Sequence, residues 1–274
     1  LADAEIRGIL NLSAPIQIYV PNGVTVPTWH GRDITLSDLA THTSALPNVP
    51  DDFFRYQNIF DPIETQAEST FRGYEEISAD DVYTWLSTLT LERGPGESWE
   101  YSNAGTAIAG DIVARTQNKS FSELVDERIL RPLGMNSTAA GWKTDLLERS
   151  AAGYRGYAPD NDEGMIIRYN EFWSPTAGII SDADDMAVYL ALQLGFIDTP
   201  DGLLNAVNKS HEPRTVRSTD GVKLWQSLFW DTFETEDNPW THLKAGETNR
   251  FMADIAFVRD KGIGVVVFSN TAYF

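Results

Sequence analysis

The sequence predicts an α+β fold in which a mainly helical lobe precedes an antiparallel-sheet lobe, and three observations support this. Apolar residues recur at three- and four-residue spacing in several segments of residues 1–195, as they do on a helix with one buried face. Two apolar runs joined by a short turn follow near the end of the chain, and they have the length of paired strands. Strands that cluster after helices indicate α+β rather than a wound parallel sheet. We expect one domain of two lobes, residues 1–195 and 196–274.

The first helices are predicted from their ends. The first ten residues form the end of a helix closed by Gly8, and residues 15–21, bounded by prolines, are expected to be extended. Thr35 begins the next helix, because Asp38 three residues later completes an acidic variant of the capping box. Residues 48–77 are rich in aromatic and acidic side chains and are expected to form a long irregular segment at the surface.

The later elements follow from the same signals. Three helices each begin at a serine N-cap, and their predicted ranges are residues 78–89, 120–130 and 181–194. Two strands of the second lobe are predicted at residues 252–258 and 263–268, with a turn at residues 259–262. Residues 241–246 are expected to be a third strand or the approach to these two.

The most informative stretch is residues 95–105, where a Pro-Gly turn delivers the tripeptide Tyr-Ser-Asn to the start of a helix rich in small residues. Asn103 is the predicted N-cap, since its side-chain oxygen can accept from the exposed N–H groups of the first turn. Tyr101 and Asn103 then lie on a loop held by rigid elements, where catalytic groups are often found. Taken alone, a Tyr-Ser-Asn tripeptide is much more often a buried tyrosine and a helix cap than a catalytic element.

Composition excludes several classes of function. The chain has 274 residues, 42% of them hydrophobic, and a formal net charge of −19, so it is a globular acidic protein and not a binder of nucleic acid or of anionic membrane surfaces. No run of residues is apolar enough for a membrane-spanning helix, and no signal peptide is visible. The absence of cysteine excludes disulfides and thiolate chemistry.

Five blocks, in this order, resemble the serine β-lactamase and penicillin-binding-protein superfamily, especially its class C β-lactamase, DD-peptidase and esterase branch. They are residues 34–47 (ITLSDLATHTSALP), 95–103 (PGESWEYSN), 130–135 (LRPLGM), 175–185 (PTAGIISDADD) and 244–246 (KAG), the last followed by FSN at 268–270. The resemblance covers nearly the whole chain. It implies a β-lactamase/DD-peptidase-like fold of a helical lobe and an antiparallel-sheet lobe, with a sheet that is incomplete here.

The resemblance also implies roles for individual residues. Tyr101 would be the general acid or base, with its pKa lowered by neighbouring cations. Lys244 would supply positive charge for a substrate carboxylate and for the Tyr101 phenolate. Asn103 would hydrogen-bond the substrate amide, and the backbone after Gly246, at Glu247, would donate one N–H group to the oxyanion.

The sequence departs from the family in two places. Ala245 stands where the family has a threonine, so a hydroxyl that binds substrate carboxylates is missing from the substrate-binding strand. No Ser-x-x-Lys motif, which carries the nucleophile of the family, occurs in these residues. The first residues resemble the segment that comes directly after that motif in the family, so we expect the chain to be truncated. Ser102 and Ser44 are weak substitutes, because neither has a lysine at helical spacing to activate it.

The leading hypothesis is a serine hydrolase that forms an acyl-enzyme with β-lactams, D-amino-acid peptides or small esters. The alternative is a non-catalytic binding or scaffold protein that retains the cleft and has lost the nucleophile. Under either hypothesis His42 is expected to be a structural residue at a helix end rather than a ligand, and Lys244 would be a surface charge if it stood outside its block. A metalloenzyme is disfavoured, because the four histidines do not occur in H-x-x-x-H spacing, and no G-x-S-x-G elbow of an α/β-hydrolase is present.

These hypotheses imply no metal and no cofactor, a small-molecule substrate, and, by resemblance, a periplasmic or secreted location. Strand edges left uncovered by an incomplete sheet would favour self-association.

Overall fold

The computed structural model of the chain describes residues 1–54, 71–141, 143–155, 168–199, 201–218, 222–236 and 240–272. Its longer helices are α5 (Ala79–Thr88), α6 (Asn103–Arg115), α11 (Ala183–Leu194) and α12 (Leu203–His211). The shorter helices are α1 (Ala2–Ile6), α2 (Leu36–Ala40), α4 (Gly73–Glu76), α7 (Phe121–Val125), α8 (Arg131–Leu133), α9 (Thr144–Leu147) and α10 (Ser174–Ala177). Single turns of other helix types are η1 (Ile16–Ile18), η2 (Asp51–Phe54), η3 (Asp126–Leu130) and η4 (Arg259–Lys261).

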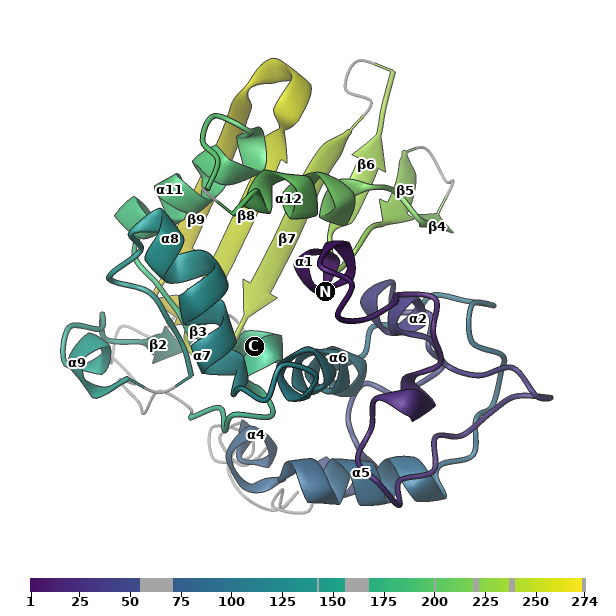
Figure 1. Ribbon diagram of the computed structural model, residues 1–274. Coiled ribbons are helices and arrows are strands. Elements are labelled where there is room, and N and C mark those ends of the chain that lie inside the picture. The colour runs from purple at the N-terminus through teal and green to yellow at the C-terminus, as the bar shows by residue number, and fades with distance from the viewer. Residues whose placement is uncertain are drawn as a thin grey trace.

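A six-stranded antiparallel sheet in the order β4-β5-β6-β7-β8-β9 forms most of the second lobe (Figure 1). Its strands are β4 (Thr215–Ser218), β5 (Lys223–Gln226), β6 (Asp231–Glu234), β7 (Thr241–Glu247), β8 (Met252–Val258) and β9 (Ile263–Ser269). Two short strand pairs lie outside this sheet: β1 (Ala139–Ala140) with β3 (Ile179–Ile180), and β2 (Tyr154–Arg155) with β10 (Thr271–Ala272). Neighbours in the main sheet are neighbours in sequence, so it is a meander built from local connections.

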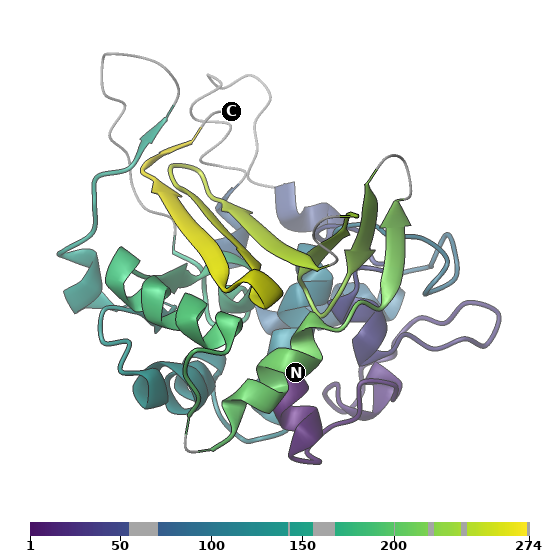
Figure 2. The ribbon, with the colours of Figure 1, turned by 90° about the horizontal axis from the view of Figure 1, so that it is seen from above.

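Helices cover one face of this sheet. α11 packs on β8 and β9, and α1 packs on α12. Figure 1 shows α12 in front of the strands, and Figure 2, seen from above, shows the helices along one side of the sheet. Beneath α11 lies a small apolar cluster of Leu194, Trp230, Ile255 and Phe257. The larger core surrounds α6, which contacts α2, α7 and α10. The small residues of α6, such as Gly110 beside Pro175, allow this close approach.

The predicted α+β class is confirmed, and so are the main elements. Three capping boxes form, of which the sequence predicts those at Thr35 and Ser120, whereas it predicts Ser78 only as an N-cap. In each box the N-cap hydroxyl accepts from the backbone N–H of the third helical residue, and the acidic side chain of that residue accepts from the N–H of the N-cap residue. The boxes are Thr35 with Asp38, Ser78 with Asp81, and Ser120 with Glu123. The three predicted strands are β7, β8 and β9, each within one residue of its expected ends.

Several local predictions are wrong by a residue or a turn. The N-cap of α6 is Ser102 and not Asn103, and that of α11 is Asp182 and not Ser181. Residues 15–21 contain the turn η1 and are not simply extended. The helix that begins after Ser120 passes through Pro132, which the first turn of α8 accommodates because no N–H is needed there.

The expected irregular segment at residues 48–77 lies partly outside the described residues. Its described ends contain η2 and α4. Phe53 is 1% exposed, so this part of the chain belongs to the core as well as to the surface. The division of the domain at residue 195 stays a prediction.

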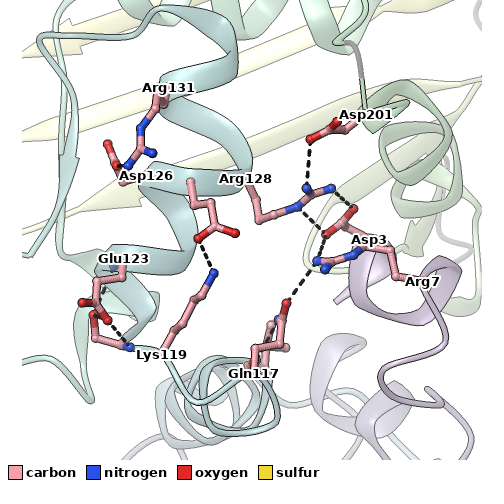
Figure 3. A network of polar contacts seen from close by, with 12 residues as sticks. Asp3, Arg7, Gln117, Lys119, Glu123, Asp126, Arg128, Arg131 and Asp201 are labelled. Carbon is pink, nitrogen blue, oxygen red and sulfur yellow. Dashed lines mark hydrogen bonds and ion pairs between the residues drawn. The ribbon is translucent and has the colours of Figure 1, made fainter.

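Arg128 in η3 is joined to α1 and to the turn before α12 by charge-assisted hydrogen bonds (Figure 3). Its guanidinium donates to both carboxylate oxygens of Asp3, at 2.9 and 3.1 Å, and to Asp201 at 3.1 Å. The Arg128 side chain is 14% exposed, so water screens these contacts only in part. A second ion pair, between Lys209 and Glu5 at 2.8 Å, joins α12 to α1. The N-terminal helix is therefore fixed to the rest of the fold by charge as well as by apolar packing.

We expect Arg128→Ala to lower the free energy of unfolding by about 2 kcal/mol, because it leaves the half-buried Asp3 without its bidentate partner. Urea unfolding followed by circular dichroism measures the change. Arg131→Ala is the matched control: Arg131 pairs with Asp126 at the surface with its side chain 72% exposed, and such pairs contribute about 0–1 kcal/mol. Equal effects of the two substitutions would contradict the role given to Arg128.

Candidate active site

Tyr101 and Asn103 are placed by the cap of α6. Between them, Ser102 is 1% exposed, and its hydroxyl donates to the carbonyl of Pro47 at 2.7 Å while it accepts from the N–H of Gly105 at 2.9 Å. The Ser102 N–H donates to Nδ1 of His42 at 3.2 Å. The buried serine thus turns its two neighbours away from the core, and Tyr101 is left 37% exposed.

A chain of hydrogen bonds runs from Tyr101 through Asn103. The Tyr101 hydroxyl donates to Oδ1 of Asn103 at 3.1 Å, and Nδ2 of Asn103 donates to the hydroxyl of Tyr74 at 3.0 Å. The backbone N–H of Asn103 donates to Oδ1 of Asn48 at 3.0 Å. Both ends of the Asn103 side chain are therefore engaged, which fixes its amide orientation.

Lys244 reaches this group from the sheet. Its Nζ lies 5.2 Å from the centre of the Tyr101 ring. Lys244 points to the same face of β7 as His242, which is 4% exposed and stacks on the ring of His211 from α12 at 4.5 Å between ring centres. The hydroxyl of Thr232 on β6 is 3.0 Å from Nδ1 of His242. The buried histidine pair thus fixes β7 two residues before Lys244.

Burial governs the ionisation of both groups. Burial, together with the negative charge of Asp231, raises the pKa of Tyr101 above its usual value. Burial lowers the pKa of Lys244, Asp231 acts in the opposite direction, and Arg217 lowers it further. The expectation that cations lower the pKa of Tyr101 is therefore wrong for this arrangement. Tyr101 is a neutral phenol that donates its hydrogen bond.

His42 supports the loop from behind. Its backbone has a φ of 54°, and its ring lies 4.6 Å from that of Tyr101 and 5.5 Å from that of Phe229. Because Nδ1 accepts the N–H of Ser102, the ring proton is assigned to Nε2. Burial and the charges of Lys244 and Arg217 lower the pKa of His42 to about 3. These contacts fit the structural interpretation of His42.

The other predicted site residues follow Lys244 along β7. Ala245, Gly246 and Glu247 are exposed and pair in register with Asp254, Ala253 and Met252 of β8. They are thus at the same end of the strand as Lys244, and their roles in binding substrate stay predictions.

A cavity of about 450 Å³ lies beside this strand end. Its walls include Tyr169, Ile180, Thr248, Ala253 and Phe268. Among the described residues that line it, Tyr101, Asn103 and Lys244 are not found. The cavity therefore adjoins the predicted site without containing it.

The two substitute serines have structural environments. Ser102 caps α6 as described, and Ser44 is 1% exposed, with its hydroxyl 3.4 Å from the N–H of Leu46. A nucleophile must be accessible and have a base within hydrogen-bond reach, and these buried hydroxyls contact backbone groups instead.

Several residues of the site could not be found by the motifs. Tyr74, Asn48, Arg217 and Asp231 come from separate segments of the chain. None of them belongs to a block with catalytic spacing, and they meet Tyr101, Asn103 or Lys244 only through tertiary contacts.

Comparison with known proteins gives a consistent result. The sequence model of the family described as Beta-lactamase matches residues 1–274. The chain is 33% identical over 180 residues to the D-alanyl-D-alanine-carboxypeptidase/endopeptidase AmpH of Escherichia coli, an alignment that covers 66% of this chain and 41% of AmpH. The chain thus spans about two fifths of that relative's length.

Solved structures agree with the fold. A β-lactamase/D-alanine carboxypeptidase from Yersinia pestis, solved with citrate, superposes with a TM-score of 0.76 at 22% identity, over 98% of this chain and 73% of that one. A class C β-lactamase from Rhodobacter sphaeroides gives a TM-score of 0.74 at 26% identity, over 99% and 76% of the two chains. The β-lactamase/DD-peptidase-like fold predicted from the sequence is therefore confirmed.

We expect stability to fall with pH below about 6.5, the ordinary pKa of histidine. In the unfolded chain His42 binds a proton near pH 6.5, whereas in the folded chain its pKa is about 3. Between these values the unfolded state holds more protons, so the stability present above pH 6.5 is lost as the pH falls towards 3. His42→Gln should reduce the slope of unfolding free energy against pH by up to about 1.4 kcal/mol per unit.

Urea unfolding of both proteins at pH 4.5, 6 and 8 measures these slopes. The difference at pH 8, where His42 is neutral in both states, isolates the packing cost of the substitution. Parallel stability curves for the two proteins would contradict the assignment.

Proposed function

The chain belongs to the β-lactamase family, and we propose that it supplies the acid/base and substrate-binding residues of a serine hydrolase that works through an acyl-enzyme. The observation that supports this most directly is the constellation at the start of α6. There Tyr101 donates to Asn103 while the ammonium of Lys244 lies over the Tyr101 ring. Two lobes of the fold each contribute to it, as expected of a cleft site.

In this proposal Tyr101 acts first as a general acid. As a neutral phenol it gives its proton to the leaving group when the acyl-enzyme forms, and Lys244 stabilises the resulting phenolate. The lysine of the Ser-x-x-Lys segment takes the proton of the attacking serine and returns it when the serine departs in the second step. The phenolate then takes a proton from the water that attacks the acyl-enzyme, which restores the phenol. Asn103 holds the substrate amide, and the N–H of Glu247 at the end of β7 serves the oxyanion.

The proposed substrates are β-lactams, D-amino-acid peptides and small esters. The names of the relatives, a carboxypeptidase/endopeptidase and β-lactamases, support the first two. Ala245 supports the third, because a methyl group cannot hydrogen-bond the carboxylate that the first two classes carry. Lys244 is then the main group available for such a carboxylate, and an ester without one makes no such demand.

We also propose that the attacking serine lies outside these 274 residues. No Ser-x-x-Lys motif occurs in the sequence, and Ser102 and Ser44 are buried. These observations equally support the alternative, a non-catalytic binding or scaffold protein with a retained cleft. The two differ in whether a longer form of the protein, carrying a Ser-x-x-Lys segment, reacts covalently.

A periplasmic or secreted location is likewise a proposal, carried by the resemblance. Within the described parts of the chain, no helix combines the length and apolarity needed to cross a membrane.

Self-association through the sheet is a further proposal. β9 is an edge strand of the main sheet, and Ile263, Val265 and Val267 on one of its faces are each more than half exposed. An uncharged edge strand with free backbone groups can pair with another chain. The lysines and glutamates that commonly protect such an edge are absent from β9 itself.

Covalent labelling tests the enzymatic proposal. After incubation of this chain with a fluorescent penicillin, or with a fluorophosphonate, intact mass should show no adduct. A form extended by a Ser-x-x-Lys segment should be labelled at that serine. Tyr101→Phe should slow this labelling about 100-fold or more, the usual contribution of general acid–base catalysis.

Tyr19→Phe is the matched control. Among the described residues, the hydroxyl of Tyr19 accepts the N–H of Asn11 and is not hydrogen-bonded to a residue of the candidate site. The Tyr19→Phe variant of the extended form should therefore be labelled at the same rate as the unsubstituted protein. An adduct on a serine of the 274 residues would overturn the proposed position of the nucleophile. Penicillin binding without an adduct in the extended form would favour the binding protein.

Light scattering tests self-association. We expect concentration-dependent dimers or larger species, and we expect Val265→Lys to shift them towards monomer, because a buried unpaired charge at the edge disfavours pairing. Val222→Lys is a control on another exposed valine, 45% exposed, away from β9. A monomer at all concentrations would contradict the proposal.

A further inference from the structure

Arg217 on β4 is held firmly against the loop that carries Tyr101. The centre of its guanidinium lies 3.4 Å from the centre of the Trp99 ring, and Nη1 donates to Oδ1 of Asp231 at 2.9 Å. Trp99 is itself fixed, because its indole N–H donates to Oε1 of the buried Gln226 at 2.8 Å. The side chains of Arg217 and Asp231 are 25% and 21% exposed, so the pair is half-buried and geometrically restricted.

Asp231 also lies beside the predicted catalytic pair, because it pairs in register with Leu243, the residue that precedes Lys244 on β7. Its charge raises the pKa of both Lys244 and Tyr101. Yet within the part of the chain that the structure describes, Lys244 has no carboxylate at ion-pairing distance. Its ammonium instead makes a cation–π contact with the Tyr101 ring. The charged and titratable groups around the Lys244 ammonium are Asp231 from β6, Arg217 from β4, His42 after α2 and Tyr101 before α6.

We propose that Arg217 is a positioning residue for Lys244: by binding Asp231 against Trp99, it keeps this carboxylate from pairing with the ammonium, which stays over the Tyr101 ring. The role of Lys244 in this inference rests on the proposed function, whereas the test of the inference does not require enzymatic activity. A lysine paired with Asp231 would be drawn towards β6 and neutralised. It would then offer less charge to a phenolate or to a substrate carboxylate.

The residue types suit this task. A guanidinium is planar and always charged, so one face can lie on an indole while its edge binds a carboxylate. A lysine ammonium can also contact an indole and a carboxylate, but it is compact and has no planar face that fixes its orientation against the ring. The Arg217–Asp231 contact therefore keeps one carboxylate from pairing with Lys244. It does so with little loss of side-chain conformational entropy, because the guanidinium is planar and already oriented.

A neighbouring triad of the same kind provides a control. Lys223 on β5 lies 4.4 Å from the Trp225 ring centre and pairs with Glu234 at 3.0 Å. No interaction of this triad with Lys244 is recorded among the described residues. Loss of Lys223 removes a stacked and paired cation from the same sheet without freeing Asp231.

The test is a double-mutant cycle read on Lys244 itself. Protein labelled with ¹³C-lysine is titrated, and the Cε signal of Lys244, assigned by its loss in Lys244→Arg, gives the pKa. Arg217→Ala should raise this pKa by about one unit or more, because Asp231 becomes free to pair with Lys244. In protein that already carries Asp231→Asn, the same substitution should raise it by less than half as much, and Lys223→Ala should leave it unchanged.

The proposal is overturned if Arg217→Ala raises the pKa of Lys244 by the same amount in protein with Asp231 and in protein with Asp231→Asn. Arg217 would then act on Lys244 only through direct repulsion. If Arg217→Ala does not fold, Arg217→Gln replaces it in the cycle. Arg217→Lys should give an intermediate shift, since it keeps the charge without the planar stack. If the double-mutant cycle gives the expected shifts but the extended form is not labelled covalently, the proposed hydrolase function is rejected. The proposed role of Arg217 in positioning Lys244 is then still supported.

Discussion

The site depends on one buried hydroxyl, that of Ser102. It begins α6 by accepting the N–H of Gly105, and it fastens the preceding loop by donating to the carbonyl of Pro47. A residue whose side chain must point inward forces its two neighbours to point elsewhere, and these neighbours are Tyr101 and Asn103. The helix cap and the placement of Tyr101 and Asn103, the proposed functional pair, thus depend on the same interaction. The structural and the functional interpretations of the tripeptide are compatible for that reason, since a cap of this kind presents the residues that chemistry would use.

The second half of the site is positioned by a different kind of contact. β7 is paired on both sides, and its inward-facing His242 is enclosed by His211, Phe257 and the hydroxyl of Thr232. Burial lowers the pKa of His242 to about 4, so this enclosure is a neutral, hydrogen-bonded layer at ordinary pH. Two residues further on, the period of the strand places Lys244 on the same face. The sheet therefore delivers a cation to the helical lobe at a point fixed by its own core.

The sequence was informative where structure is determined locally. Capping boxes involve residues three apart, and the final strands are adjacent and joined by a tight turn, so both could be predicted from short patterns. The N-cap of α6 was misassigned because Ser102 and Asn103 are both good caps, and periodicity does not resolve a single residue. Tyr74, Arg217 and Asp231 could not be predicted, because their contacts join distant segments. The direction of the Tyr101 pKa shift could not be predicted either, since it reflects burial and the negative charge of Asp231.

That balance defines the chemistry the site favours. Burial opposes both charged forms, the phenolate of Tyr101 and the ammonium of Lys244, so transfer of the phenolic proton to bulk water is unfavourable in the resting arrangement. In the proposed function, negative charge that develops on a bound acyl group would change this, because it would supply the ammonium with a counter-charge in surroundings where such an interaction is strong. The proposed site would then be most stable when a substrate approaches the transition state, and its resting state would keep Tyr101 protonated so that it can act as an acid. The arrangement of charges around Lys244 thus matters more than the presence of any single residue of the motif.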